Sequence, residues 1–170
     1  DARYKCPGFR AARAQRARTL GMLLLCFGPG HALSNRRAPD VREACAEAYG
    51  ADTTGYVMPM TELLGVISAC EWRRRGVPVA ALGDRIHAHF GVFAPVRGEY
   101  LDLLASAPLP AAPVDGALAF DIGTGTGVIA AILARRGVSR VIATDVNPRA
   151  LTCARDNIAR LGLASRVAVL

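Results

Sequence analysis

A run of glycines and threonines between two aspartates is the part of this sequence best suited to holding a ligand. Residues 123–127 read Gly-Thr-Gly-Thr-Gly; Asp121 precedes them, and Asp145 follows 24 residues after Asp121. Glycines let the backbone turn sharply and approach a ligand closely, and the N–H groups that open the next helix attract anionic groups. A carboxylate at Asp145 can accept two hydrogen bonds from a ribose diol.

The elements around this loop predict an α/β domain. Strands alternating with helices of this length indicate parallel strands with right-handed crossovers, the Rossmann-like, doubly wound sheet, of which only the first three strands are present. Asn147 is expected to cap the second helix and Gly162 to end it. The expected elements are a strand at 117–122, a helix from Val128 to Arg136, a strand at 140–144, a helix from Pro148 to Ala159 or Leu161, and a third strand from Val167.

The glycine spacing argues against a dinucleotide. That fingerprint needs its third glycine at position 128, where this chain has Val128. A carboxylate at Asp121 also suits an ammonium-bearing ligand better than a pyrophosphate. Both features make a nicotinamide dehydrogenase a less favoured function for this chain.

Three stretches of the chain resemble one enzyme family. Residues 120–127, Phe-Asp-Ile-Gly-Thr-Gly-Thr-Gly, resemble the glycine-rich motif of class I S-adenosylmethionine-dependent methyltransferases, and residues 144–148, Thr-Asp-Val-Asn-Pro, resemble their second motif. Upstream, residues 90–95, Phe-Gly-Val-Phe-Ala-Pro, resemble the entry segment of the small-domain methyltransferases. That group includes ribosomal RNA guanine-N2 enzymes, with release-factor glutamine methyltransferases as relatives. The resemblance covers roughly residues 85–170.

The resemblance implies S-adenosylmethionine as cofactor and a position for each site residue. Glycines of the loop would line the methionine and ribose side, one aspartate would lie near the amino group, and the other would bind the ribose hydroxyls. A proline and an aromatic ring upstream would form a lid, and neither a metal nor a membrane is implied. The residues so assigned are Gly123, Thr124, Gly125 and Gly127 in the loop, Asp121 near the amino group, Asp145 on the ribose, and Phe93 and Pro95 in the lid.

The family's Asn/Asp-Pro-Pro-aromatic motif, which holds a planar NH2 group and follows the fourth strand, is not in this chain. We therefore expect a fragment lacking both ends, with no identifiable catalytic residue, an exposed sheet edge and apolar face, and no activity alone. The parent enzyme is expected to methylate a planar nitrogen of an RNA base, with a protein glutamine as second choice.

The part before the loop divides by composition. Residues 1–76 are expected to be mostly helical, with helices at 10–27, at 41–49 after an Asp40 cap, and from Thr61 to Arg75. An irregular stretch is expected at 50–60. Residues 77–116 are expected to be the lid segment and linker, extended in part over 77–96, with a short helix from Tyr100 to Leu104 and a proline-rich linker at 105–116.

Charge leaves a second class of function open. Lys and Arg number 21 against 14 Asp and Glu, and residues 1–20 carry six basic side chains against one acidic. A solvated arginine-rich surface explains this, but a non-catalytic RNA-binding module using the N-terminal arginines and the Trp72–Arg75 turn is the alternative function. His87 and His89 alternate as metal ligands could, yet no third ligand stands at a matching spacing, so no metal site is predicted.

Cysteine usage favours the cytoplasm. The five cysteines are widely spaced, odd in number and without a Cys-x-x-Cys pair, which is typical of reduced thiols used as small apolar residues. A basic stretch at 10–18 followed by apolar residues 20–27 has the order of a secretory signal, which is the minor alternative. The chain opens on Asp1 instead of Met, so the true N-terminus is expected to be absent.

Overall fold

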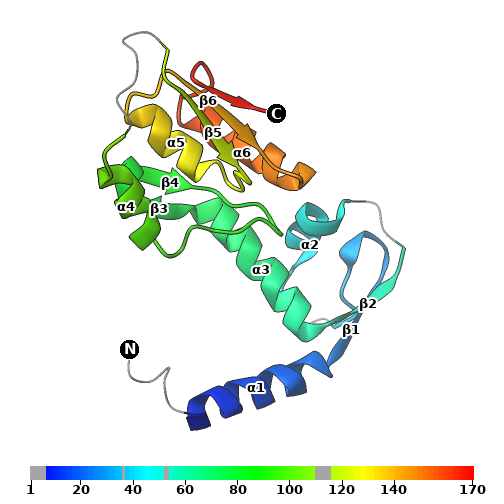
Figure 1. The fold of residues 1–170 in the computed structure, drawn as a ribbon. Coiled ribbons are helices and arrows are strands. Elements are labelled where there is room, and N and C mark those ends of the chain that lie inside the picture. The colour runs from blue at the N-terminus through cyan, green and yellow to red at the C-terminus, as the bar shows by residue number, and fades with distance from the viewer. Residues whose placement is uncertain (1–6, 36, 52–53, 110–115) are drawn as a thin grey trace. The chain divides into compact units, whose positions relative to one another are not determined.

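The computed structural model describes residues 7–35, 37–51, 54–109 and 116–170. The chain forms two compact units, which we call the N-terminal unit, residues 1–70, and the C-terminal unit, residues 71–170. Helix α3, Met60–Arg75, crosses the boundary between them (Figure 1). Each unit is described by itself.

The N-terminal unit contains an antiparallel strand pair that the sequence did not predict. After α1, Pro7–Gly21, the chain forms β1, Leu24–Phe27, which pairs with β2, Tyr56–Pro59. The prediction of one helix over 10–27 was therefore wrong in its last part, and the stretch 50–60 is not irregular throughout. The apolar run at 20–27 fits a helix or a strand equally well by periodicity, and pairing with distant residues decides between them.

Helix α2, Arg42–Tyr49, lies between the two strands along the chain. It begins one residue later than predicted, with Val41 at the N-cap position, although the Asp40 Oδ1 atom still accepts a hydrogen bond from the Arg42 N–H at 3.1 Å. Gly50 ends the helix with φ of 91°, and Gly76 ends α3 with φ of 68°, as predicted.

Strands β5, Leu118–Ile122, β6, Arg140–Thr144, and β7, Val167–Val169, form a parallel sheet in the order β5-β6-β7. Helix α5, Val128–Arg135, connects the first two strands and α6, Pro148–Arg160, connects the second pair. The alternating strands and helices confirm the predicted α/β Rossmann-like architecture.

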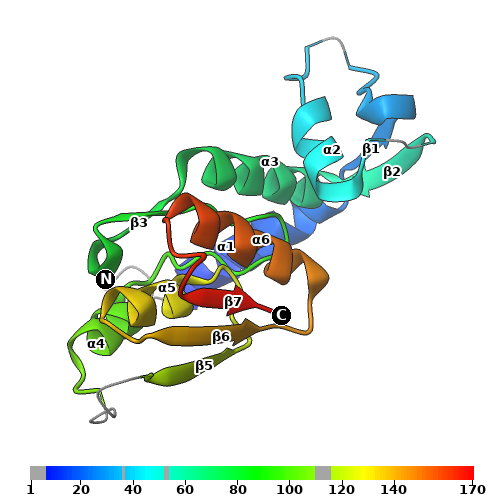
Figure 2. The ribbon, with the colours of Figure 1, turned by 90° about the horizontal axis from the view of Figure 1, so that it is seen from above.

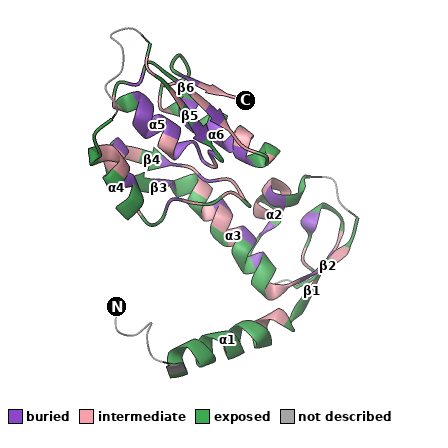
Figure 3. Ribbon diagram, in the orientation of Figure 1, coloured by how far each residue is buried: buried purple, intermediate pink, exposed green. Residues whose placement is uncertain are grey.

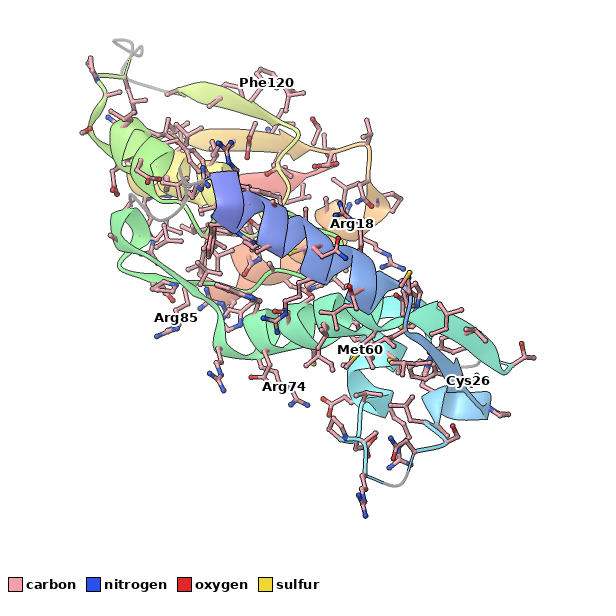
Figure 4. All side chains as sticks on the ribbon, turned by 90° about the horizontal axis from the view of Figure 1, so that it is seen from below. Arg18, Cys26, Met60, Arg74, Arg85 and Phe120 are labelled. Atoms are coloured by element: carbon pink, nitrogen blue, oxygen red, sulfur yellow. The ribbon has the colours of Figure 1, made fainter. Side chains whose placement is uncertain are left out.

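Both connecting helices cover the same side of the sheet (Figure 2). Most of α5 is buried (Figure 3), and the core gathers Ala131, Ile132, Val141, Ala143 and Ile158. On the opposite face Leu118, Phe120 and Ile122 are 51%, 60% and 75% exposed, and Figure 4 shows Phe120 on the outer side of β5. The predicted exposed apolar face is present.

A hairpin and a helix precede the sheet in the C-terminal unit. Strands β3, Val77–Val79, and β4, Asp84–Ile86, pair antiparallel, which confirms partly extended structure over 77–96. Helix α4, Glu99–Ser106, is longer than predicted and packs against α5. The predicted linker falls partly on residues 110–115, which lie outside the described part of the chain.

Cys45, Cys70 and Cys153 form no disulfide and are buried, as the sequence predicted for small apolar residues; Cys26 forms no disulfide and is exposed, and Cys6 lies outside the described residues. Across the described ranges, none of the helices has both the length and the apolar character needed to cross a membrane.

Candidate functional site

The glycine loop begins at the carboxyl end of the sheet. The N–H groups of Gly123 and Thr124 both donate to the Thr144 carbonyl oxygen at 2.8 Å. This pair of bonds fixes the start of the loop to the last residue of β6, so the loop and Asp145 lie at the same edge. Ligands of open parallel sheets bind beyond this edge.

Asp121 ties the loop to the helix that follows it. Its side chain is only 6% exposed, and its Oδ2 atom accepts from the Thr124 hydroxyl at 2.6 Å and from the Ala130 N–H at 3.1 Å. Ala130 lies in the first turn of α5, where backbone N–H groups need acceptors. The carboxylate therefore joins strand, loop and helix into one rigid turn.

Asp145 spans the loop and the start of the next helix. Its Oδ2 atom accepts from the Gly125 N–H and its Oδ1 atom from the Asn147 N–H, both at 2.9 Å. These bonds, first that from Asn147 and then that from Gly125, lower the pKa of the Asp145 carboxyl below its usual value. An ionised carboxylate has about four acceptor positions. Two backbone bonds therefore leave Asp145 able to accept hydroxyl groups from a ligand.

The three glycines of the loop are required for two different reasons. A Cβ atom at Gly123, with φ of 76°, or at Gly125, with φ of 57°, would meet no atom within 4 Å. A Cβ atom at Gly127, with φ of 80°, would lie 3.3 Å from the Cα atom of Ala154 in α6. Gly127 thus allows the close approach of α6, whereas Gly123 and Gly125 border open space that a ligand can use.

Helix α6 begins as predicted. The Asn147 Oδ1 atom accepts from the Arg149 N–H at 3.0 Å, and Pro148 is the first helical residue. The Asn147 cap therefore fixes the start of α6 next to the turn in which the Asp145 Oδ1 atom accepts from the Asn147 N–H.

The sequence did not point to Asn157, a residue that holds the site together. It is 1% exposed, its Oδ1 atom accepts from the His87 N–H at 2.8 Å, and its Nδ2 atom donates to the carbonyl oxygens of His87 at 3.0 Å and Thr126 at 3.1 Å. One amide therefore joins α6, the glycine loop and the segment before the domain. Its position one turn after Cys153, on the buried side of an amphipathic helix, was the available signal.

The two predicted lid residues are not brought onto the loop by hydrogen bonds between described residues. Phe93 is 74% exposed and Pro95 is buried. Their segment does approach α6, because the Arg149 guanidinium lies 5.9 Å from the centre of the Phe90 ring. The lid role stays a prediction.

His87 and His89 follow β4 and are not part of a strand. The His87 Nδ1 atom lies 2.6 Å from the Arg73 carbonyl oxygen, and the His89 Nε2 atom lies 3.1 Å from Asp156 Oδ2. Within the ranges that the structure describes, no group of three or more His, Cys, Asp or Glu side chains could hold a metal ion.

Comparison with known proteins agrees with this geometry. A family model described as a methyltransferase domain matches residues 119–170. A ribosomal protein L11 methyltransferase of Pelotomaculum thermopropionicum is 44% identical over 55 residues, which are 32% of this chain and 18% of that protein. A release factor glutamine methyltransferase of Cereibacter sphaeroides is 52% identical over 52 residues, 30% of this chain and 19% of that protein.

The chain thus spans less than a fifth of the length of these two curated relatives. Among solved structures, one titled delta-N METTL16 MTase domain is 17% identical, with a TM-score of 0.45, over 64% of this chain and 47% of that one. Residues 119–170 are thus similar to a methyltransferase domain, and the comparisons support a class I S-adenosylmethionine-dependent methyltransferase as the kind of protein that this segment resembles.

Proposed function

We propose that residues 121–145 form the cofactor-binding half of a methyltransferase site. The observation that carries the proposal is the pair of carboxylates, Asp121 and Asp145, which backbone N–H groups fix around a loop whose Gly123 and Gly125 border open space. Bound S-adenosylmethionine would supply an electrophilic methyl group. Asp145 would accept the ribose hydroxyls, and Asp121 would attract the amino group directly or through water.

Each residue's part in this proposal follows from what it contacts. Gly123 and Gly125 leave room for the cofactor, while Thr124 orients the Asp121 carboxylate and Gly127 lets α6 pack close. These groups bind and orient; they do not transfer protons. Rate enhancement would come from holding the methyl group in line with a nitrogen nucleophile. We assign no catalytic residue within the described ranges.

For the acceptor we propose a protein nitrogen ahead of an RNA base. The names of the two curated relatives given above state a ribosomal protein and a release factor as what those proteins methylate. A planar amide nitrogen, as in glutamine, is a poor nucleophile. The parent enzyme would therefore have to place a hydrogen-bond acceptor beside it.

Calorimetric titration of the chain with S-adenosylhomocysteine tests the cofactor site. Wild type is expected to bind and Asp145→Ala to lose binding, while Asp156→Ala, an aspartate of α6 remote in the chain from the loop, serves as the matched control. Equal binding by wild type and Asp145→Ala would sink the proposal. The acceptor is tested in the parent protein with methyl-labelled S-adenosylmethionine, offered with ribosomal proteins and release factors or with total RNA.

A second candidate is a non-catalytic RNA-binding module. It is favoured by α1, in which residues 8–19 are all exposed and carry Arg10, Arg13, Arg16 and Arg18. The first three follow at i, i+3 and i+6 and so lie along one side of the helix. This candidate predicts salt-dependent RNA binding that survives Asp145→Ala and fails when these arginines are replaced by glutamine.

A further inference from the structure

The N-terminal unit has a cavity that the proposed methyltransferase site does not use. Its volume is about 260 Å³. Ligand pockets for whole drug-sized molecules begin at roughly 300 Å³, so this one suits a single side-chain head group. The end of α2, strand β2 and the first turn of α3 supply the lining residues: Tyr49, Tyr56, Val57, Met58 and Glu62.

Two aromatic rings form the walls. The centres of the Tyr49 and Tyr56 rings are 6.5 Å apart and their planes meet at 61°. Phe27 stacks on Tyr56 with centres 4.8 Å apart and planes at 1°, so one face of Tyr56 is covered and its ring is held in place. The faces of such rings carry partial negative charge and attract cations.

The direction of the Tyr56 hydroxyl proton follows from His31. The His31 Nε2 atom lies 2.6 Å from the Gly50 carbonyl oxygen, which can only accept, so Nε2 carries the proton. A ring protonated at Nε2 alone has an acceptor at Nδ1, to which the Tyr56 hydroxyl at 2.8 Å can donate, and the Cys45 side chain is a second hydrogen-bond partner of this phenol. The phenol keeps this proton at neutral pH, because burial raises the pKa of Tyr56 to about 12.

The Tyr49 hydroxyl group also has a hydrogen-bond partner within the protein. The Tyr49 hydroxyl donates to the Glu62 Oε1 atom at 2.7 Å. Both phenols are therefore hydrogen-bonded inside the protein. Glu62 adds a carboxylate, which only accepts when ionised. The polar side chains of the lining thus offer acceptors and negative charge, and call for a ligand rich in donors.

We propose that this cavity binds the guanidinium group of a peptide arginine. A guanidinium is planar, stacks on aromatic rings and carries five N–H donors, so it matches a lining that combines aromatic rings with the Glu62 carboxylate. An ammonium group has only three donors and no flat face. The site is independent of the proposed methyltransferase function.

His31 is the positioning residue of this site. It is 1% exposed and has φ of 62°, the only positive value at a non-glycine residue in the described ranges. Such backbone strain persists only where surrounding contacts hold it. Here the contacts are the bonds to Gly50 and Tyr56, and their effect is to fix the phenol that faces Tyr49.

The test is a titration of the whole 170-residue chain followed by nuclear magnetic resonance. The probes are N-acetylarginine amide and its neutral isostere N-acetylcitrulline amide. The arginine probe is expected to shift the ring protons of Tyr49 and Tyr56 in a saturable manner, and the citrulline probe to bind at least about tenfold more weakly, since it lacks the charge. Equal affinities, or no shift of these ring protons, would overturn the proposal.

Variants locate the binding. Glu62→Gln keeps an acceptor for the Tyr49 hydroxyl but removes the charge, and should weaken arginine binding about tenfold. Glu71→Gln removes the same charge from the same helix, α3, and should leave the affinity unchanged. Unchanged binding by Glu62→Gln contradicts the proposal. Because Glu62 is exposed, amide exchange of the β1–β2 pair should match wild type and so exclude a folding defect.

Sedimentation of the chain with and without the arginine probe distinguishes the sources of the guanidinium. Dissociation of an oligomer by the probe identifies an arginine of a second copy of this chain as the occupant. A monomer under both conditions excludes a second copy and leaves an arginine of another peptide as the source.

Discussion

The polar groups of the two candidate sites are held in different ways. In the C-terminal unit, carboxylates and an amide bind backbone groups: Asp121 holds Ala130, Asp145 holds Gly125, and Asn157 holds His87. In the N-terminal unit, two side-chain pairs, His31–Tyr56 and Tyr49–Glu62, accompany the bond from His31 to the Gly50 backbone.

The first arrangement fixes the path of the backbone and leaves open space beside glycines, where a ligand can contact main-chain groups. The second arrangement fixes the orientation of the two tyrosine rings, with Phe27 covering one face of Tyr56. Under the two proposals, the C-terminal unit would surround an extended cofactor and the N-terminal unit would hold a compact head group.

The largest test of this contrast compares two asparagines of one helix. Asn157→Ala removes a buried amide with backbone partners on three segments, and should lower the free energy of unfolding by about 3 kcal/mol. Asn147→Ala removes only the N-cap of the same helix, and should cost about 1 kcal/mol. Urea denaturation measures both. Similar losses for the two variants would show that Asn157 does not organise the loop.

A second pair separates packing from ligand space. Gly127→Ala forces a Cβ atom to 3.3 Å from Ala154 in addition to a positive φ, and should destabilise the C-terminal unit by about 2 kcal/mol. Gly123→Ala meets open space, and should cost about 1 kcal/mol for its positive φ alone. Under the proposed function, Gly123→Ala should nevertheless weaken S-adenosylhomocysteine binding. Normal binding by that variant would place the cofactor elsewhere.

Local signals in the sequence explain why part of the C-terminal unit could be predicted. Its turns are marked locally: glycines at 123–127, Asn147 before Pro148, and Gly162 after the helix dictate where each element begins or ends. Each element so bounded was placed within one or two residues. The candidate residues Asp121, Thr124, Gly125 and Asp145 were brought together because the carboxyl ends of parallel strands meet at one edge.

Nonlocal choices could not be read in the same way. Leu24–Phe27 becomes a strand because it pairs with Tyr56–Pro59, some thirty residues later, and no local signal marks that partner. Asn157 is one polar residue on a helix, and only the approach of His87 and Thr126 makes it central. The same holds for His31, whose role depends on Tyr56 and Gly50.

The N-terminal network is tested by His31→Asn. Asparagine tolerates the left-handed backbone at φ of 62°, but its shorter side chain cannot reach both the Tyr56 hydroxyl and the Gly50 carbonyl oxygen. The variant should therefore lower the free energy of unfolding of the N-terminal unit by about 1–2 kcal/mol. Amide hydrogen exchange should be faster in β1 and β2 and unchanged in β5 and β6. Faster exchange in both sheets would contradict the separation of the two networks.

The smallest expected effect concerns the pH dependence of Asp145. Its pKa is lowered in the folded protein, so its ionised form contributes stability above the unfolded value of about 3.9. That contribution is lost as the pH falls through the folded pKa. Asp145→Asn should therefore be less stable than wild type at pH 7, and the difference should shrink steadily below about pH 3.9. Urea denaturation over the acid range measures it.

Asp40 in the N-terminal unit provides the control that sharpens this result. Bonds from Arg42 lower the pKa of Asp40 to about 2, yet both partners are exposed. An exposed ion pair is screened by salt and contributes little to stability. Asp40→Asn should therefore change the free energy of unfolding over the acid pH range less than Asp145→Asn does, and its effect should vanish in high salt. An equal or larger salt-resistant effect of Asp40→Asn would mean that backbone anchoring gives Asp145 no advantage over a side-chain ion pair.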